Sequence, residues 1–203
     1  MKNKNFQVAV SSLLIGLIFS SYLSLSSFMI SSENIRKNVL RLHIKANSDT
    51  DFDRQLKLKV RDEILKESSD IFSGASDLED AVKNCENAKE KIQKTAEKTI
   101  AENGYNYPVK IEIGRSFFPV KTYENTTLPA GDYTALRITI GEGKGHNWWC
   151  VMFPPLCLPA AEGEKSLSDV LSEDEENLTK QNPKYEFRFK IAELIEKFCS
   201  KAK

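Results

Sequence analysis

The feature that most constrains this chain is an apolar run close to its amino terminus. Lys2 and Lys4 are the only charged residues before Glu33, and the stretch 6–30 is dominated by aliphatic and aromatic side chains. About 20 apolar residues cross the hydrocarbon core of a bilayer, so the run is long enough to span one. A basic start followed by an apolar run is also the pattern of a secretion signal. We therefore expect residues 1–30 to be a signal peptide or signal anchor, and the rest of the chain to work outside the cytoplasm.

Residues 31–203 are expected to form a single exported domain of nearly balanced charge. The chain has 29 basic and 29 acidic residues, and removing the first 30 takes away two lysines and no acid, which leaves 27 and 29. Such a domain has no net field to attract nucleic acid, so we expect no nucleic-acid partner. Ser24 and Ser26 have the small-residue spacing that signal peptidases use, and the sequence leaves open whether the signal is cleaved.

Hydrophobic periodicity predicts a strand followed by a helix at the start of the domain. Leu42 and Ile44 alternate with polar residues within 39–45, which is typical of a half-buried strand. The turn-forming residues 47–51 should then begin a helix. Its apolar side chains recur at every fourth position, at Phe52, Leu56, Val60 and Ile64.

The remaining pattern predicts one more long helix and several strands. An apolar stripe over 77–102 indicates a single helix that ends at Asn103-Gly104. Alternation predicts strands at 109–113, 133–140, 147–153 and 185–189, with a last helix at 191–198. Glycines at 141, 143 and 145 predict a tight hairpin between the strands 133–140 and 147–153. The fold class expected is α+β, with a mostly antiparallel sheet and two or three helices.

One segment near the carboxyl end breaks this regular pattern. Residues 162–176 contain seven acidic residues, one lysine and no aromatic side chain. A run of this composition buries too little apolar surface to order itself. We therefore predict a mobile acidic loop at 162–184.

The sequence has no strong signature for a metal, a cofactor or a catalytic group. The only histidines are His43 and His146, and no zinc-ligand spacing or nucleophile elbow occurs. The glycines at 141–145 lie between two strand patterns, whereas a phosphate-binding loop needs a helix behind it. We therefore expect no catalytic residue, metal or cofactor.

Cys150 is the one nucleophile with a conceivable chemical role. His146 lies about 13 Å from it along a strand, so a catalytic base would have to be His43 from another strand. The alternative is a structural disulfide between Cys150 and Cys157, because Pro154-Pro155 bends the chain between them. Closing this short loop would stabilise the fold by about 2.5 kcal/mol.

Two adjacent tryptophans mark a candidate contact surface. On a strand Trp148 and Trp149 face opposite sides, so they cannot both serve one role. Trp149 shares its face with Val151 and Phe153, the more apolar set, so we predict that Trp149 lies in the core with Phe153, Leu42 and Ile44. We predict that Trp148, with Met152, binds a partner, because tryptophan often dominates interfaces. A basic surface on the first domain helix, formed by Arg54, Lys57 and Arg61, is the second candidate for partner binding.

Several long motifs resemble the stage II sporulation protein R family of endospore-forming Firmicutes. They are Leu40–Asp49, continuing through Leu56–Asp62, then Pro129–Arg137, and Gly141–Cys157 with its Asn-Trp-Trp-Cys and Phe-Pro-Pro-Leu-Cys sequences. A weaker match is Phe187–Ile191. The likeness covers nearly all of the exported part in the family's order, and it departs mainly in the acidic segment.

The resemblance implies a signalling protein rather than an enzyme. Members of the family are exported from the forespore into the space between forespore and mother cell. There they activate a membrane-embedded protease that processes the precursor of the mother-cell sigma-E factor. The resemblance also implies that the N-terminal segment contacts the membrane before any cleavage of the signal. The alternative function is an exported cysteine-dependent hydrolase that acts on cell wall or peptide through Cys150.

Overall fold

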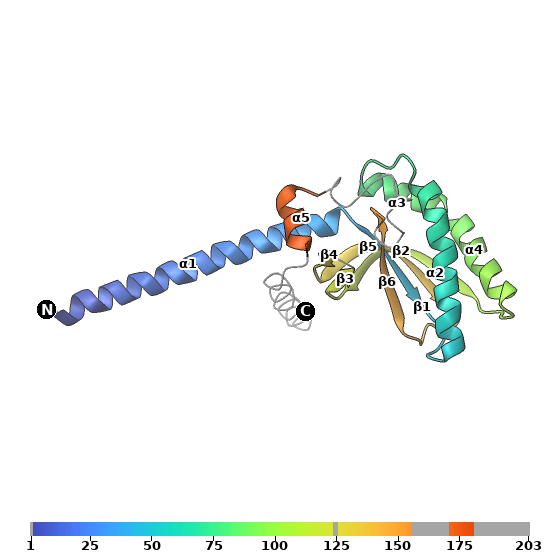
Figure 1. Cartoon of the computed structure of the whole chain (residues 1–203), viewed down its shortest axis with the longest axis horizontal. Coiled ribbons are helices and arrows are strands. Elements are labelled where there is room, and N and C mark those ends of the chain that lie inside the picture. Colours follow the sequence, from blue (N-terminus) through green and yellow to red (C-terminus); the bar gives the residue numbers. More distant parts are fainter. Residues whose placement is uncertain (1, 124–125, 156–170, 181–203) are drawn as a thin grey trace.

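The computed structural model describes residues 2–123, 126–155 and 171–180 (Figure 1). Its elements are, in chain order, α1 (Lys2–Lys37), β1 (Leu40–Lys45), α2 (Asp51–Phe72), α3 (Leu78–Asn87), α4 (Lys89–Glu102), β2 (Val109–Phe118), β3 (Lys121–Tyr123), β4 (Thr126–Leu128), β5 (Gly131–Ile140), β6 (Asn147–Phe153) and α5 (Glu173–Thr179). The fold is α+β, as predicted, with five helices in the described part of the chain instead of two or three.

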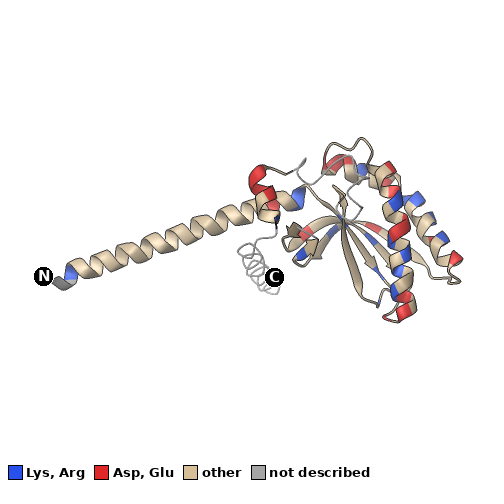
Figure 2. Cartoon of the chain, in the orientation of Figure 1, with Lys and Arg blue, Asp and Glu red and all other residues tan. Residues whose placement is uncertain are grey.

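Helix α1 projects away from the rest of the domain (Figure 1). Between Lys4 and Glu33 it has no charged side chain, so it is almost uniformly tan in Figure 2. Its segment Lys4–Lys37 is long and apolar enough to cross a membrane, a property that secretion signals near an N-terminus share. The last turns of α1 belong to the domain, because Phe28 and Ile35 are buried in its core.

The main sheet has four strands in the order β2-β5-β1-β6. Strand β1 pairs in parallel with β5 and antiparallel with β6, and β2 pairs antiparallel with β5. The predicted hairpin between β5 and β6 is therefore wrong, because β1 lies between them. The glycine turn after β5 passes over the end of β1 and leads into β6, so it joins strands that are not neighbours.

Two layers cover this sheet on opposite faces. Helices α2, α3 and α4 cover one face, while the end of α1, the β3-β4 hairpin and α5 lie on the other (Figure 1). Leu42 and Ile44 are fully buried in the first core, between the sheet and the helices. Tyr133, Phe118 and Val151 belong to the second core, on the α1 side.

Helix α2 packs through the apolar stripe that the sequence predicts, apart from its first member. Leu56, Val60 and Ile64 are buried, whereas Phe52 is 72% exposed. A step of four residues turns the helix by about 400°, so each step moves the side chain about 40° around the axis. Over three steps this drift carries Phe52 off the packed face. Asp53, the next residue, is buried in its place.

The long helix predicted at 77–102 is two helices, α3 and α4, that meet at Ala88. Ala88 has a ψ of −2°, far from the helical value of about −42°. The regular helix is therefore interrupted at this residue, and α4 begins at the next one. No glycine or proline marks this break in the sequence. The apolar stripe continues across it, and Cys85, Ile92 and Ile100 are buried in the first core.

Helix α5 lies within the segment predicted to be a mobile loop, and the prediction is wrong for this part. A capping box joins Ser172 and Glu175 at its start, which satisfies free backbone N–H groups. Leu171 and Leu178 are buried in the second core, so two leucines are enough to hold this acidic helix. Residues 162–170 and 181–184 of the predicted loop lie outside the described residues. So do the strand and helix predicted at 185–189 and 191–198.

A β-bulge changes which way the end of β6 faces. Val151 pairs with Arg41 and Phe153 pairs with Leu40, which leaves Met152 as an extra residue. The bulge turns Phe153 toward the first core, while Val151 stays in the second. The prediction that Phe153 shares a face with Trp149 and Val151 is therefore wrong, because strict alternation stops at the bulge.

Gly145 lies where the β5-β6 turn meets the loop after β1, and its lack of a side chain is required there. A Cβ at this position would lie 2.2 Å from the backbone oxygen of Ser48, whereas a Cβ at Gly114 in β2 would meet nothing within 4 Å. We expect Gly145→Ala to lower the free energy of unfolding by about 1–3 kcal/mol, because backbone must move. Gly114→Ala is the control and should change it little. Chemical denaturation measures both, and equal stabilities would contradict the expectation.

Candidate functional site

Within the described residues, the α1-side face of the sheet is covered over only part of its length. Arg41, Tyr133 and Val151 are buried on this face, beneath the second layer. Toward the carboxyl end of β1, the residues of the same face are half-buried or exposed. We call these the uncovered sheet face: Lys45, Lys110, Glu112, Arg137, Thr139, His43, Asn147 and Trp149.

Strand register arranges these residues in two rows across all four strands. One row runs through Glu112, Arg137, His43 and Trp149, since Arg137 pairs with Glu112 and with His43, and His43 pairs with Trp149. The next row holds Lys110, Thr139, Lys45 and Asn147. Four paired strands thus hold the side chains on a rigid support.

Positive charge predominates on this face. Lys45, Lys110 and Arg137 come from three strands, and Glu112 is the one acidic residue among the described members of the face. Glu112 already contacts Lys110 at 3.1 Å and Arg137 at 3.7 Å. These contacts lower the pKa of the Glu112 carboxyl, chiefly through the hydrogen bond from Lys110. The acid is therefore shared between two cations, and the face keeps an excess of positive charge.

Trp149 is held in place by its neighbours on this face. Its ring stacks on His43 with centroids 6.0 Å apart, and the Nζ atom of Lys121 in β3 lies 5.1 Å from the centroid of the indole. A lysine over an indole face makes a cation–π contact. The tryptophan is thus half-buried but oriented, as a binding anchor needs to be.

The pKa of His43 is lowered below its ordinary value. Burial lowers the pKa of its imidazole, and the positive charges of Lys45 and Arg137 lower it further. A hydrogen bond with the Oδ1 atom of Asn147 at 2.8 Å acts in the opposite direction without cancelling these effects.

Arg41 lies just under the covered end of the face as a fully buried cation. Its guanidinium carbon is 4.4 Å from the ring centroid of Phe118 and 4.8 Å from that of Tyr133. Its Nε atom donates to the backbone oxygen of Cys150 at 3.0 Å, and Nη2 donates to the hydroxyl of Tyr123 at 2.6 Å. Aromatic rings and neutral oxygens surround this charge, while its Nη1 atom has no hydrogen-bond partner in the described part of the chain.

The loop between β1 and α2 is tied to the β5-β6 turn at the end of the face. The side-chain oxygen of Asn47 accepts from the backbone N–H of Glu142 at 3.0 Å, and its amide donates to Asp53 at 2.9 Å. Ser48 also donates to Asp53, at 2.5 Å. Burial works to raise the pKa of Asp53, but the hydrogen bonds from Ser48, Asn47 and Tyr107 outweigh it, and the pKa is lowered. The Asn-Ser-Asp sequence thus builds a fixed rim.

His146 contributes to the same rim. Its backbone N–H donates to Asp49 at 2.6 Å, its ring nitrogen Nδ1 contacts the same carboxylate, and its backbone oxygen accepts from Lys57 at 2.7 Å. The hydrogen bonds with His146 lower the pKa of Asp49. Within the described ranges, no group of His, Cys, Asp and Glu side chains could hold a metal ion.

The residues predicted to bind a partner do not form one surface. Met152 is buried in the first core, and Lys57 is 5% exposed because its Nζ atom reaches His146. Arg54 is exposed and pairs with Asp51. Arg61 lies with its guanidinium carbon 4.4 Å from the Trp148 ring centroid, on the helix-covered side.

Both tryptophans are half-buried, and they pack against different cores on opposite faces of the sheet. Trp148 packs against the first core beneath α2, and Trp149 lies on the uncovered sheet face beside the second core. The prediction assigned Trp149 to the core because of its apolar neighbours on the strand. The sequence did not show that Arg61 of α2 packs over the ring of Trp148. Leu42, Ile44 and Phe153, the other predicted core residues, are buried.

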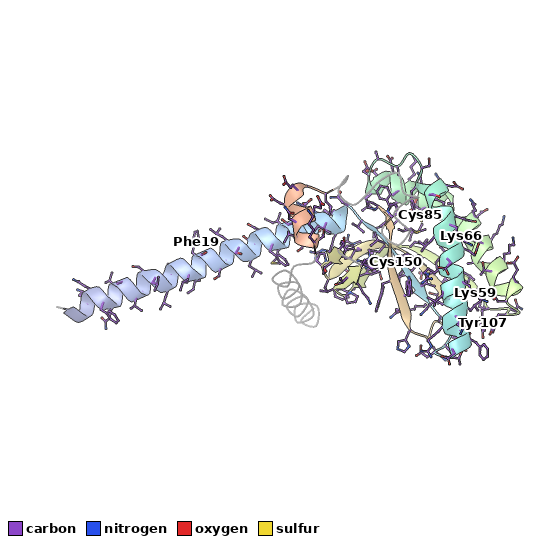
Figure 3. The ribbon with its side chains drawn as sticks, in the orientation of Figure 1. Phe19, Lys59, Lys66, Cys85, Tyr107 and Cys150 are labelled. Atoms are coloured by element: carbon purple, nitrogen blue, oxygen red, sulfur yellow. The ribbon has the colours of Figure 1, made fainter. Side chains whose placement is uncertain are left out.

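Cys150 cannot form the catalytic pair considered from the sequence. Its side chain belongs to the first core, whereas His43 projects from the other face of the sheet. Cys150 is also disulfide-bonded. Its predicted partner, Cys157, lies outside the described residues. Cys85 is a free, buried thiol in the helical layer (Figure 3), and burial raises its pKa to about 12.

Sequence reasoning missed the uncovered sheet face for two reasons. Lys45, Arg137 and His43 look like ordinary polar positions of half-buried strands, and only the strand order brings them side by side. Lys121 comes from a three-residue strand that the periodicity did not reveal. The alternation of Arg41, His43 and Lys45 does indicate part of this face, because it puts three basic residue types on one side of the strand.

Fold and site together define a single α+β domain carried on an N-terminal apolar helix, with one basic sheet face left open. The chain belongs to the stage II sporulation protein R family, whose family model matches residues 36–163. This range begins at the end of α1 and includes the whole four-stranded sheet.

A curated relative agrees with the family match. The chain is 37% identical over 150 residues to stage II sporulation protein R of Bacillus subtilis (strain 168). The match covers 74% of this chain and 66% of the relative, so it spans just under two thirds of the relative's length. No solved structure matches the chain significantly.

The positions of the two tryptophans predict different effects for their removal. We expect Trp148→Ala to lower the free energy of unfolding by about 2–4 kcal/mol, since it empties space beneath α2. Trp149→Ala should cost about half as much or less, because its ring borders solvent. Thermal and chemical unfolding of the two variants measure this difference. A larger loss for Trp149→Ala would contradict the assignment of faces.

The lowered pKa of His43 predicts a pH-dependent stability with a defined sign. The unfolded imidazole has a pKa of about 6.5, above that of the folded protein, so the unfolded state binds the proton first as the pH falls. The free energy of unfolding should therefore decrease between about pH 7.5 and 5.5. His43→Gln should reduce this decrease. Equal slopes for wild type and His43→Gln would contradict the prediction.

Proposed function

We propose that this protein is an exported sporulation signal that activates a membrane-bound protease, which then processes the precursor of the mother-cell sigma-E factor. The signal acts in the space between forespore and mother cell. Its domain binds the protease and does no covalent chemistry of its own.

Membership in the stage II sporulation protein R family is the observation that carries this proposal. Two features of the molecule support it. The part of α1 between Lys4 and Glu33 has no charged side chain and is suited to export or to membrane attachment. The domain also leaves one rigid, basic sheet face open, which is suited to contact with a partner. The hydrolase alternative loses its candidate pair, since Cys150 and His43 lie on opposite faces of the sheet.

A deletion within α1 tests whether the protein acts outside the cytoplasm that makes it. Residues 2–25 are removed, which keeps the buried Phe28 and Ile35 and so preserves the second core. We expect this variant to fold but to lose processing of the sigma-E precursor in sporulating cells. The control carries an unrelated cleavable secretion signal before residue 26 and should restore processing.

A reconstitution tests the activity itself. Full-length protein is placed in vesicles with the purified protease and its precursor substrate, and cleavage of the precursor is followed over time. We expect cleavage to rise at least about tenfold when the protein is present, which corresponds to about 1.4 kcal/mol. Unchanged cleavage, or normal signalling by the deletion variant, would show that the proposed function is wrong.

A further inference from the structure

We infer that the uncovered sheet face binds an acidic, carboxylate-bearing segment of the partner protein. The identity of that partner as the membrane protease rests on the proposed function, whereas the acidic character of the segment rests on this face alone. The inference thus names the contact surface and the chemistry that it recognises.

The distribution of charge is the first argument. The exported part as a whole is close to neutral, with 27 basic residues against 29 acidic ones once the two lysines of the first 30 residues are subtracted. The helical layer shows both colours mixed along α2 and α4 (Figure 2). The uncovered sheet face instead gathers Lys45, Lys110 and Arg137, with Lys121 at its border, against Glu112. A surface of one predominant sign attracts a segment of the opposite sign and suppresses wrong partners.

Unsatisfied donors are the second argument. The Nε atom of Arg137 is buried and has no hydrogen-bond partner in the described part of the chain, although the side chain is 35% exposed. Its Nη2 atom reaches Glu112 only at 3.7 Å. An arginine presents its N–H groups in a planar fork that fits a carboxylate, so an incoming carboxylate would pair with the exposed part of the Arg137 side chain, which Glu112 does not reach at hydrogen-bond distance.

Pre-organisation is the third argument. Trp149 is oriented between His43 and Lys121, and the surrounding side chains stand on four paired strands. A partner would therefore order few side chains when it binds. The stiff support, with an oriented indole on its edge strand β6, favours a protein segment over lipid headgroups, which need only loosely placed charges.

Charge reversal on the face tests the inference in the reconstituted system. Lys45→Glu/Lys121→Glu changes the charge by four units on or beside the face. The matched control, Lys94→Glu/Lys98→Glu, makes the same change at exposed positions of α4 in the helical layer. We expect the first variant to lower activation at least about tenfold and the control to keep it within about twofold.

Three outcomes would overturn the inference while leaving the proposed function intact. One is equal activation by both variants and wild type, and another is an equal loss in both. The third is a loss for Lys45→Glu/Lys121→Glu that occurs only in vesicles containing phosphatidylglycerol and not in neutral phosphatidylcholine, which would identify the anion as lipid. Failure of wild type to activate is a different result and concerns only the proposed function.

A binding measurement without the protease keeps the inference testable even if the charge-reversal variant unfolds. The chain has two tryptophans, so Trp148→Phe leaves Trp149 as the single fluorophore, and Trp149→Phe leaves Trp148. A polyglutamate peptide should change the emission of the full-length Trp148→Phe variant in a saturable, salt-sensitive way. The Trp149→Phe variant should not respond, and polylysine should affect neither. No response of Trp149, or an equal response of both, would contradict binding at this face.

Discussion

The central position of β1 is the constraint on which the rest of the structure depends. This strand follows α1 after only two residues, and it pairs with β5 on one side and β6 on the other. Its residues Leu42 and Ile44 face the helical core and Arg41 faces the second core, all fully buried. Because β1 contributes to both cores, the end of the membrane-length helix is fastened to the middle of the sheet.

The unequal covering of the sheet connects this architecture to function. Three helices cover one face and bury the apolar residues of β1 and most of those of β5 on it, whereas in the described part of the chain the small second layer covers only the end of the other face near α1. A sheet face without a cover must be largely polar in order to remain soluble, and here three cations and one acidic residue share the face with one tryptophan. The same incomplete layer thus holds α1 in place and leaves a binding surface beside it.

Buried Arg41 shows how the domain tolerates a charge where the covered part of the α1-side sheet face meets the uncovered sheet face. Three aromatic rings lie within cation–π distance, and two neutral oxygens accept its hydrogen bonds. Isolated charges are costly inside proteins unless such contacts compensate for the lost water. The arginine lies under the covered end of the face, two residues before His43, whose pKa is lowered by burial and by the charges of Lys45 and Arg137.

Local patterns in the sequence determined the apolar N-terminal helix, β1, most of α2, the alternation of β2 and β5, and the family resemblance. Each of these depends on residues close together in the chain, where spacing and composition are sufficient. Tertiary structure alone decided that β1 separates β5 from β6, that a bulge at Met152 turns Phe153 inward, and that Trp148 rather than Trp149 lies beneath α2. Strand order and the covering of a face depend on contacts between segments about a hundred residues apart. Local periodicity cannot show which face of β6 a helix covers, because the strand has apolar side chains on both faces.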